Sequence, residues 1–366
     1  MHLGDRHLRS VKLLFVTRRL APDTRSIPAV VFANLYADAR INHDVRMVAG
    51  YVRGRRFVPQ EALGVDLCGR GDLSARATMR RAVRREARRF RPDVVLVNDL
   101  SAPISGRPTV CLLHDLSFDA PTPTLRSRLL GQVAAVRGAS FDRIVVPSKA
   151  LATRLDSLGV DARRVLQIAH GVDTERFAPQ PIDPDQTITR LLCPGRILPG
   201  SGQHIAIDAV ARLTSAEKAR VQLRVVGPAI DPVYYEQLKV QAWRQPVSFQ
   251  SNPGDMADAY RDTDMVIYPT LMHEGFADPV TRAMACELPV VWSEQPSLRE
   301  AMGTFGSPVP PGDVLALREH IRRHLADPLA SRATQRGARD AAMRRFDRKK
   351  TWRHLERELA KVADQA

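Results

Sequence analysis

Hydrophobic and polar positions along the chain follow two alternating patterns. Short apolar runs, such as VKLLFVT at residues 11–17 and DVVLVN at residues 93–98, are typical of strands buried on both faces of a parallel sheet. Between such runs, residues 29–40 and 72–91 carry apolar positions at helical spacing. Further strands are predicted at residues 44–52, 109–114 and 143–148, and further helices at residues 125–139 and from Lys149 onward. The alternation of strand and helix predicts an α/β fold.

A proline- and aspartate-rich segment, PQPIDPDQ at residues 179–186, interrupts this alternation and predicts a linker. The alternation then starts again. Strands are predicted at residues 190–196, 221–227, 246–250, 264–269 and 288–293, and helices at residues 202–213, 232–243, 255–263, 279–287, 313–328, 331–346 and 347–365. We therefore expect two Rossmann-like domains that divide near residue 180.

The composition is that of a globular protein: 366 residues, of which 44% are hydrophobic and 26% charged, suffice for two domains. No apolar run approaches the roughly 20 residues of a membrane span, and residues 1–19 lack the apolar core of a signal peptide, so we expect a cytoplasmic protein. The cysteines Cys68, Cys111, Cys193 and Cys286 have no paired spacing. We interpret them as reduced structural residues rather than metal ligands.

The net charge of +15 is the strongest compositional signal, and most of the excess is arginine. In the helix predicted at residues 72–91, six arginines lie opposite an apolar stripe of Met79, Val83, Ala87 and Phe90. These arginines are Arg80, Arg81, Arg84, Arg85, Arg88 and Arg89. Two readings stay open: peripheral contact of this helix with anionic lipid at the inner face of the membrane, or a solvated outer face in an arginine-rich composition. Without aromatic interleaving or a nucleic-acid motif, nucleic acid is not an expected partner.

The stretch at residues 268–302 gathers the residues best suited to a binding site. A strand runs into a loop with Glu274, Gly275 and Phe276, and Pro279 then opens a helix. A helix N-terminus offers unpaired N–H groups and partial positive charge, and a glycine lets a ligand approach the backbone. Proline suits the first helical position, because its missing N–H would have no partner there. The pattern predicts a site for an anion and a polyol.

Four stretches in this chain resemble the large family four of retaining glycosyltransferases, which is typified by bacterial mannosyl- and glucosyltransferases. They are HDLSFDAP from His114, IAHGVDTERFAP from Ile168, PGRILPGSGQHIAIDAV from Pro194 and HEGFADPVTRAMACELPVVWSEQPSLREAMG from His273. Their order and spacing match the family along nearly the whole chain.

The resemblance implies the GT-B fold, in which two Rossmann-like domains enclose an interdomain cleft. Residues 1–180 would form the acceptor side and residues 181–345 the nucleotide-sugar side, and a C-terminal helix over residues 346–366 would cross back to the first domain. The resemblance also implies an enzyme that transfers a hexose with retention of anomeric configuration and needs no metal or other cofactor.

The resemblance further assigns roles to single residues. His114 matches the histidine that faces the donor sugar from the first domain, and Glu274 matches the acidic residue that binds the sugar hydroxyls. Arg196 matches an arginine that binds the diphosphate, a task suited to its fork of donors. The expected donor-binding residues also include Ser201, Gly275, Phe276, Thr281 and Arg282. Structural roles for His114, Arg196 and Glu274, as a core histidine, a surface charge and a loop cap, stay open.

Four features on the donor side depart from the family pattern. Residues 21–29 lack the paired glycines that normally cover the diphosphate, and Ser201 stands in place of a lysine. Asp278 replaces an apolar residue, and Arg282 replaces a glutamate that normally holds the ribose hydroxyls. Each lost charge-assisted contact costs roughly 1.5–3 kcal/mol of binding free energy. Arg282 either restores positive charge near the helix start or simply pairs with Asp278, four residues away.

Two functions therefore stand. In the first, the protein is an active glycosyltransferase that uses a nucleotide-sugar donor and a saccharide, lipid-linked or small-molecule acceptor. In the second, it is a catalytically silent GT-B protein that binds a saccharide or supports a partner enzyme. The joint presence of His114, Arg196 and Glu274 favours the transferase. Nucleotide-sugar epimerases share the fold but match the loop motifs less well.

Overall fold

The computed structural model describes residues 9–18, 27–51, 62–68, 72–98, 106–115, 140–181, 186–251 and 254–365. The chain forms two compact units. The first consists of Met1–His170 together with Lys349–Ala366, and the second of Gly171–Arg348. The first unit thus ends at His170, ahead of the boundary predicted near residue 180, and the second extends to Arg348 rather than residue 345.

Hydrogen bonds explain why the segment after His170 belongs to the second unit. The Val172 N–H donates to the Phe346 carbonyl oxygen at 2.6 Å, and the Arg348 N–H donates to the Val172 carbonyl oxygen at 3.0 Å. These bonds join residues far apart in the sequence. The proline-rich segment near residue 180 consequently falls inside the second unit rather than between the two.

The described part of the first unit is built on a seven-stranded sheet whose neighbouring strands all run parallel. In the order β3-β2-β1-β4-β5-β6-β7, the strands are β1 Lys12–Thr17, β2 Asp44–Tyr51, β3 Ala62–Asp66, β4 Val94–Val97, β5 Thr109–Leu112, β6 Arg143–Val146 and β7 Val165–Gln167. The predicted strands are confirmed, and β3 and β7 are additional. The helix predicted at residues 125–139 lies outside the described residues.

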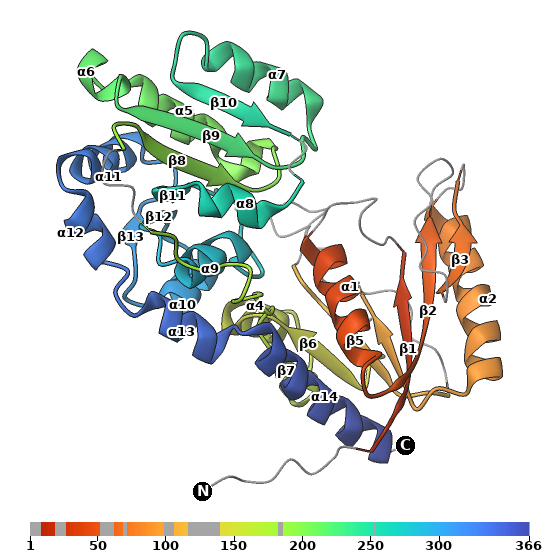
Figure 1. The fold of residues 1–366 in the computed structure, drawn as a ribbon. Coiled ribbons are helices and arrows are strands. Elements are labelled where there is room, and N and C mark those ends of the chain that lie inside the picture. The colour runs from red at the N-terminus through yellow and green to blue at the C-terminus, as the bar shows by residue number, and fades with distance from the viewer. Residues whose placement is uncertain are drawn as a thin grey trace, which may run out of the picture. The chain divides into compact units, whose positions relative to one another are not determined.

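Helices cover both faces of this sheet, and their labels can be followed in Figure 1. They are α1 Ile27–Ala39 and α14 Arg348–Asp364 on one face, and α2 Asp72–Phe90 and α4 Lys149–Ser157 on the other, with a short 3-10 turn at Ala162–Arg164 before β7. Leu13 and Phe15 of β1 pack with α1 and α14, whereas Leu14 and Val16 pack with α2 and α4. An uninterrupted apolar run is needed because both faces of the strand are buried.

The second unit carries a six-stranded parallel sheet in the order β10-β9-β8-β11-β12-β13. Its strands are β8 Thr189–Pro194, β9 Val221–Val226, β10 Val247–Gln250, β11 Met265–Tyr268, β12 Val290–Ser293 and β13 Ser307–Val309. Its helices are α5 Gln203–Ala211, α6 Ser215–Lys218, α7 Pro232–Gln241, α8 Met256–Arg261, α9 Asp278–Ala285, α10 Pro296–Met302, α11 Val314–Ala326, α12 Pro328–Ala333 and α13 Ala338–Arg345, with a 3-10 turn, η2, at Pro199–Ser201.

The prediction for this unit is confirmed for its strands but wrong at one helix. Residues 331–346 form two helices, α12 and α13, instead of one. Gly337 separates them with a φ of 81°, a left-handed conformation that glycine adopts without a steric penalty. The short elements β13 and α10 were not predicted. The α/β class and the two Rossmann-like parts are both confirmed.

The cysteines are free, and Cys111, Cys193 and Cys286 are buried. Burial raises the pKa of the Cys193 and Cys286 thiols to about 12, so both stay protonated and fill the core as small apolar residues. Within the described ranges, no helix is both long and apolar enough to cross a membrane. The same ranges contain no group of three or more His, Cys, Asp or Glu side chains placed to hold a metal ion.

Candidate functional site

The predicted donor-side residues of the second unit gather at the carboxyl ends of β8 and β11, which are neighbours in the sheet. The loops that leave these strands touch through their backbones. The Leu271 N–H donates to the Gly200 carbonyl oxygen at 2.8 Å, and a β-carbon on Gly202 would overlap the Pro269 carbonyl oxygen. Such close backbone contact fixes the loop of Arg196 against the loop of Glu274.

Two hydroxyl groups hold the Glu274 carboxylate. Its Oε1 accepts from the Tyr268 hydroxyl at 2.9 Å and from Thr270 Oγ1 at 3.1 Å. Burial raises the pKa of Tyr268 well above its ordinary value, and the negative charge of Glu274 adds a smaller rise. The phenol therefore keeps its proton and donates. Tyr268 and Thr270 are thus site residues that sequence reasoning missed. A partly exposed carboxylate held in this way is suited to accept hydrogen bonds from sugar hydroxyls.

Arg196 and Ser201 lie on the tight loop between β8 and α5. The Gly195 N–H donates to the Val226 carbonyl oxygen at 3.0 Å, and the Arg196 carbonyl oxygen accepts from Gln203 Nε2 at 2.9 Å. The Arg196 side chain is half-buried, whereas Ser201 is only 6% exposed on the turn η2. The small, buried hydroxyl of Ser201 therefore occupies the position that a lysine has in the family pattern.

The predicted helix is present as α9, but it begins at Asp278, one residue before Pro279, which therefore lies second in its first turn. Its N-cap residue, Ala277, supplies no side-chain cap, but the Val280 and Thr281 N–H groups both donate to the Ala277 carbonyl oxygen at 3.1 Å. Two predicted donor residues also have internal contacts. The Thr281 hydroxyl donates to the Asp278 carbonyl oxygen at 3.0 Å, and Phe276 packs against Phe346 with ring centroids 5.7 Å apart. Donor contact through either side chain remains a prediction.

The two readings of Arg282 can be compared with its observed position. Its guanidinium lies 3.4 Å from Asp278 Oδ2 and 5.3 Å from the ring centroid of Phe177. Asp278 is 2% exposed; burial raises the pKa of its carboxyl, and the positive charge of Arg282 opposes that rise. The pairing along α9 is therefore present. Only Nη2 of Arg282 is within reach of the carboxylate, so the other guanidinium N–H groups could still contact a phosphate.

His114 lies in the first unit, just beyond the carboxyl end of β5, and is 8% exposed. Its Nε2 lies 2.7 Å from Asn98 Oδ1, and its Nδ1 lies 2.8 Å from His170 Nε2. Burial, with a smaller contribution from the charge of His170, lowers the pKa of His114 well below its ordinary value. His114 is thus a neutral ring at neutral pH, with both nitrogens engaged. Asn98 and His170 are further residues that the sequence did not single out.

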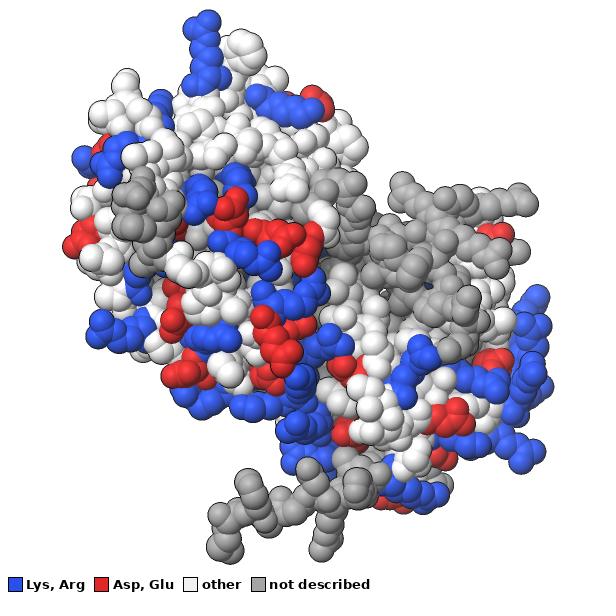
Figure 2. Space-filling view, viewed as in Figure 1, with Lys and Arg blue, Asp and Glu red and all other residues white. Residues whose placement is uncertain are grey.

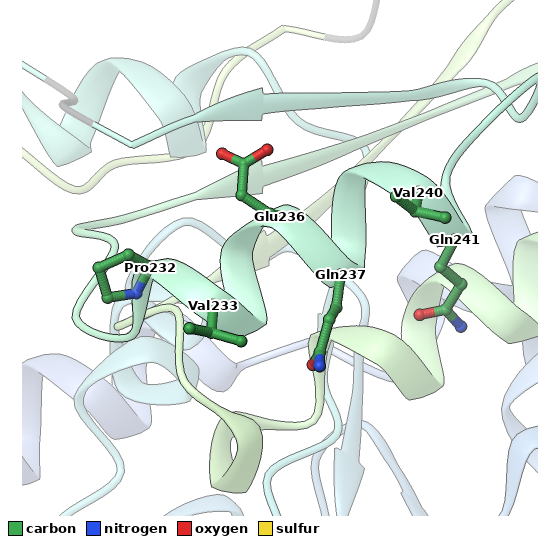
Figure 3. Close-up of a pocket in the computed structure, with 6 residues that line it drawn as sticks. All are labelled: Pro232, Val233, Glu236, Gln237, Val240 and Gln241. Carbon is green, nitrogen blue, oxygen red and sulfur yellow. The ribbon is translucent and has the colours of Figure 1, made fainter.

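Two surface grooves lie apart from these residues. One follows the outer side of α7 and is lined by Pro232, Val233, Glu236, Gln237, Val240 and Gln241, all from this helix (Figure 3). The other lies on α2 and is lined by Arg81, Arg84, Arg85, Arg88 and Arg89, where basic side chains gather in Figure 2. The apolar stripe of α2 is buried and its arginines are exposed, as predicted. None of the predicted donor residues lines either groove.

Two doubly wound parallel sheets, each with loops at its carboxyl edge, are the architecture of GT-B proteins. Residues 30–176 match the sequence model of Glycosyltransferase Family 4, and residues 188–327 match that of Glycosyl transferases group 1. The two ranges together take in most of the chain. The protein therefore belongs to the GT-B glycosyltransferases of the family-four type.

Individual relatives agree with this assignment. The chain is 31% identical over 211 residues to D-inositol 3-phosphate glycosyltransferase of Geodermatophilus obscurus, over 50% of this chain and 44% of that protein. It is 31% identical over 215 residues to phosphatidyl-myo-inositol mannosyltransferase of Mycobacterium leprae, over 56% and 55% respectively. The matches thus span about half the length of these relatives. Among solved structures, Anabaena HepE in complex with UDP and glucose superimposes with a TM-score of 0.81 at 20% identity, over 96% of this chain and 99% of that one.

Proposed function

We propose that the protein transfers a hexose from a nucleotide-sugar donor to a saccharide, lipid-linked or small-molecule acceptor, with retention of anomeric configuration and without a metal. The observation that carries this proposal is the position of Glu274, which Tyr268 and Thr270 hold beside the loop of Arg196. The family and the sugar-transferring relatives support it. So does the likeness to HepE, whose solved structure is a complex with UDP and glucose.

The chemistry asks the site to stabilise a departing nucleoside diphosphate. Arg196 offers a planar set of donors for the phosphate oxygens, and the N-terminus of α9 adds partial positive charge. These groups would carry out the task that a divalent ion performs in other enzymes. Glu274 would accept hydrogen bonds from the sugar hydroxyls and so orient the ring for transfer.

Calorimetry with UDP-glucose, GDP-mannose, UDP and GDP tests donor binding. We expect at least one of them to bind at millimolar concentration or better, and binding of none would overturn the transferase proposal. On the donor that is turned over, Glu274→Ala should lower kcat about hundredfold or more, because an oriented polar contact is lost at the reacting sugar. Tyr268→Phe should have a smaller effect, since the carboxylate remains and loses one of its supports.

The catalytically silent alternative is favoured by Ser201 and by the pairing of Arg282 with Asp278, which occupy positions where donor contacts are expected. It predicts that a saccharide binds while nucleotide-sugars do not. The same calorimetric panel, extended with glucose and mannose, separates the two functions. Donor turnover that is abolished in Glu274→Ala would exclude the silent alternative.

We also propose peripheral contact of the α2 arginines with anionic lipid at the cytoplasmic face of a membrane. The groove of exposed arginines supports it, as does the lipid in the name of the M. leprae relative. Sedimentation with phosphatidylglycerol vesicles tests it. Arg84→Glu/Arg88→Glu should abolish binding at low salt, whereas Arg353→Glu/Arg357→Glu on α14 makes the same charge change elsewhere and should retain most of it. Equal loss in both variants would contradict a role for α2.

A further inference from the structure

A row of polar side chains crosses the carboxyl edge of the first unit's sheet around His114. Thr17 ends β1, Asn98 directly follows β4, and His170 follows β7. Asn98 Nδ2 donates to Thr17 Oγ1 at 3.4 Å, and the amide oxygen of Asn98 faces His114. The rings of His114 and His170 are tilted by 54° with centroids 4.9 Å apart. A chain of contacts thus links four strand ends, with Asn98 and His170 touching His114 and Thr17 touching Asn98.

We propose that Asn98 and His170 are positioning residues that hold His114 as a neutral imidazole with its proton on Nε2. The inference rests on the proposed function, together with the family resemblance, which implies that His114 faces the donor sugar. It goes further by assigning to His170 and Asn98 a role in setting the protonation and orientation of that ring.

The donor and acceptor atoms around His114 decide which of its nitrogens carries the proton. Asn98 uses Nδ2 as a donor to Thr17, so its Oδ1 is an acceptor and His114 Nε2 must carry the hydrogen. A neutral imidazole has one N–H, which leaves His114 Nδ1 as an acceptor. His170 Nε2, 2.8 Å away, is then the donor. The hydrogen bond made by one ring nitrogen decides which of the two nitrogens carries the proton.

Neutrality has a chemical consequence in glycosyl transfer. As the bond to the leaving group lengthens, positive charge develops on the sugar ring. An imidazolium beside that ring would repel the developing charge, whereas a neutral imidazole whose two nitrogens are hydrogen-bonded to Asn98 and His170 can lie beside it without this penalty. His114 is 8% exposed and His170 7% exposed, so neither ring is well hydrated as a cation.

Long-range ¹H–¹⁵N spectra of histidine-labelled protein test the proposal without any donor. His114→Gln identifies the His114 signals by their loss. At pH 6.5, the ordinary midpoint of histidine, wild-type His114 should show the neutral Nε2–H pattern. His170→Phe removes the donor to Nδ1 but leaves Asn98, so His114 should keep its Nε2–H while the resonance of Nδ1 shifts. His170→Gln supplies an amide N–H and should restore the Nδ1 resonance. A charged ring or an Nδ1–H pattern in the wild type would overturn the proposal, as would an unchanged Nδ1 resonance in His170→Phe.

A second variant covers the case in which His170→Phe fails to fold, which circular dichroism would reveal. Asn98→Asp places a carboxylate at Nε2 and should make His114 protonate at a higher pH than in the wild type. No change in this titration would contradict the contact. On UDP-glucose or GDP-mannose, whichever is cleaved, His170→Phe should lower kcat about ten- to hundredfold with KM little changed. If neither donor is cleaved, the spectra still decide the proposal about His114, and only the proposed function fails.

Discussion

Gly227, at the end of β9, lies so close to Gly195, at the end of β8, that a β-carbon on Gly227 would overlap the Gly195 carbonyl oxygen. Gly227 also has a φ of 152°, which other residues rarely adopt. Gly195 directly precedes Arg196. The contact between the two glycines therefore fixes the start of the loop that carries the expected diphosphate ligand.

Gly227→Ala should destabilise the second unit by about 3–5 kcal/mol, because it combines a backbone overlap with an unfavourable φ. Scanning calorimetry measures this as a lower unfolding temperature. Gly337→Ala is the matched control, since Gly337 has a φ of 81° and a β-carbon added there would meet no atom within 4 Å. It should cost only about 1 kcal/mol. Similar losses in both variants would show that the overlap with Gly195 is relieved by a small shift.

The end of α9 offers a stabilising change. The Leu288 N–H donates to the Ala283 carbonyl oxygen at 3.0 Å and the Glu287 N–H to that of Met284 at 3.1 Å, the bond pattern of a Schellman motif. Glu287 is the left-handed residue of this motif, with a φ of 52°. Glu287→Gly should therefore raise the free energy of unfolding by about 0.5–1 kcal/mol. Glu287→Ala retains the strained backbone, so an equal gain from alanine would contradict this explanation.

The fold was predictable wherever burial on both faces of a strand left a continuous apolar run. Strand β1 is an example, because its alternate residues Leu13 and Leu14 enter two different clusters. The strands β3, β7 and β13 are short and carry no such run, so only pairing with their neighbours identifies them. The boundary between the two units could not be read from the local sequence either. The segment after His170 is hydrogen-bonded to the chain near Phe346, far away in the sequence.

The candidate site was predictable where its contacts are local. Arg282 lies one helical turn from Asp278, and from this spacing the ion pair was foreseen as one alternative. The His114–His170 contact joins residues 56 positions apart. No periodicity in the sequence reports such a contact. It requires the strand order to be known.

The pairing of Asp278 with Arg282 leads to a test of nucleoside binding. Arg282→Glu alone would place a second carboxylate beside buried Asp278, so its effect on binding would be mixed with a loss of stability. The double variant Asp278→Leu/Arg282→Glu avoids this and supplies a carboxylate for the ribose hydroxyls. It should bind UDP or GDP about tenfold more tightly in calorimetry, as expected for one hydrogen bond to a charged group. Weaker binding would instead show that Arg282 contacts the phosphates.

His324 gives the second unit a pH-dependent stability. It is 1% exposed at the end of α11, and its Nδ1 has no hydrogen-bond partner among the described residues. Burial lowers its pKa to about 4; the nearby charge of Asp264 opposes this shift and that of Arg332 adds to it. The unfolded chain takes up a proton near pH 6.5, whereas the folded protein does so only near pH 4. The contribution of neutral, buried His324 to the free energy of unfolding is therefore fully present above pH 6.5 and is lost as the pH falls toward 4.

The free energy of unfolding of the second unit should be about 2 kcal/mol lower at pH 5 than at pH 7 on account of this group alone. Urea unfolding at the two pH values measures the difference. His324→Leu removes the titrating ring and keeps an apolar side chain of similar size, so its pH dependence should be smaller by that amount. His354→Leu makes the same substitution at an exposed histidine of α14 and serves as the control. An equal reduction in both variants would rule out burial of His324 as the cause.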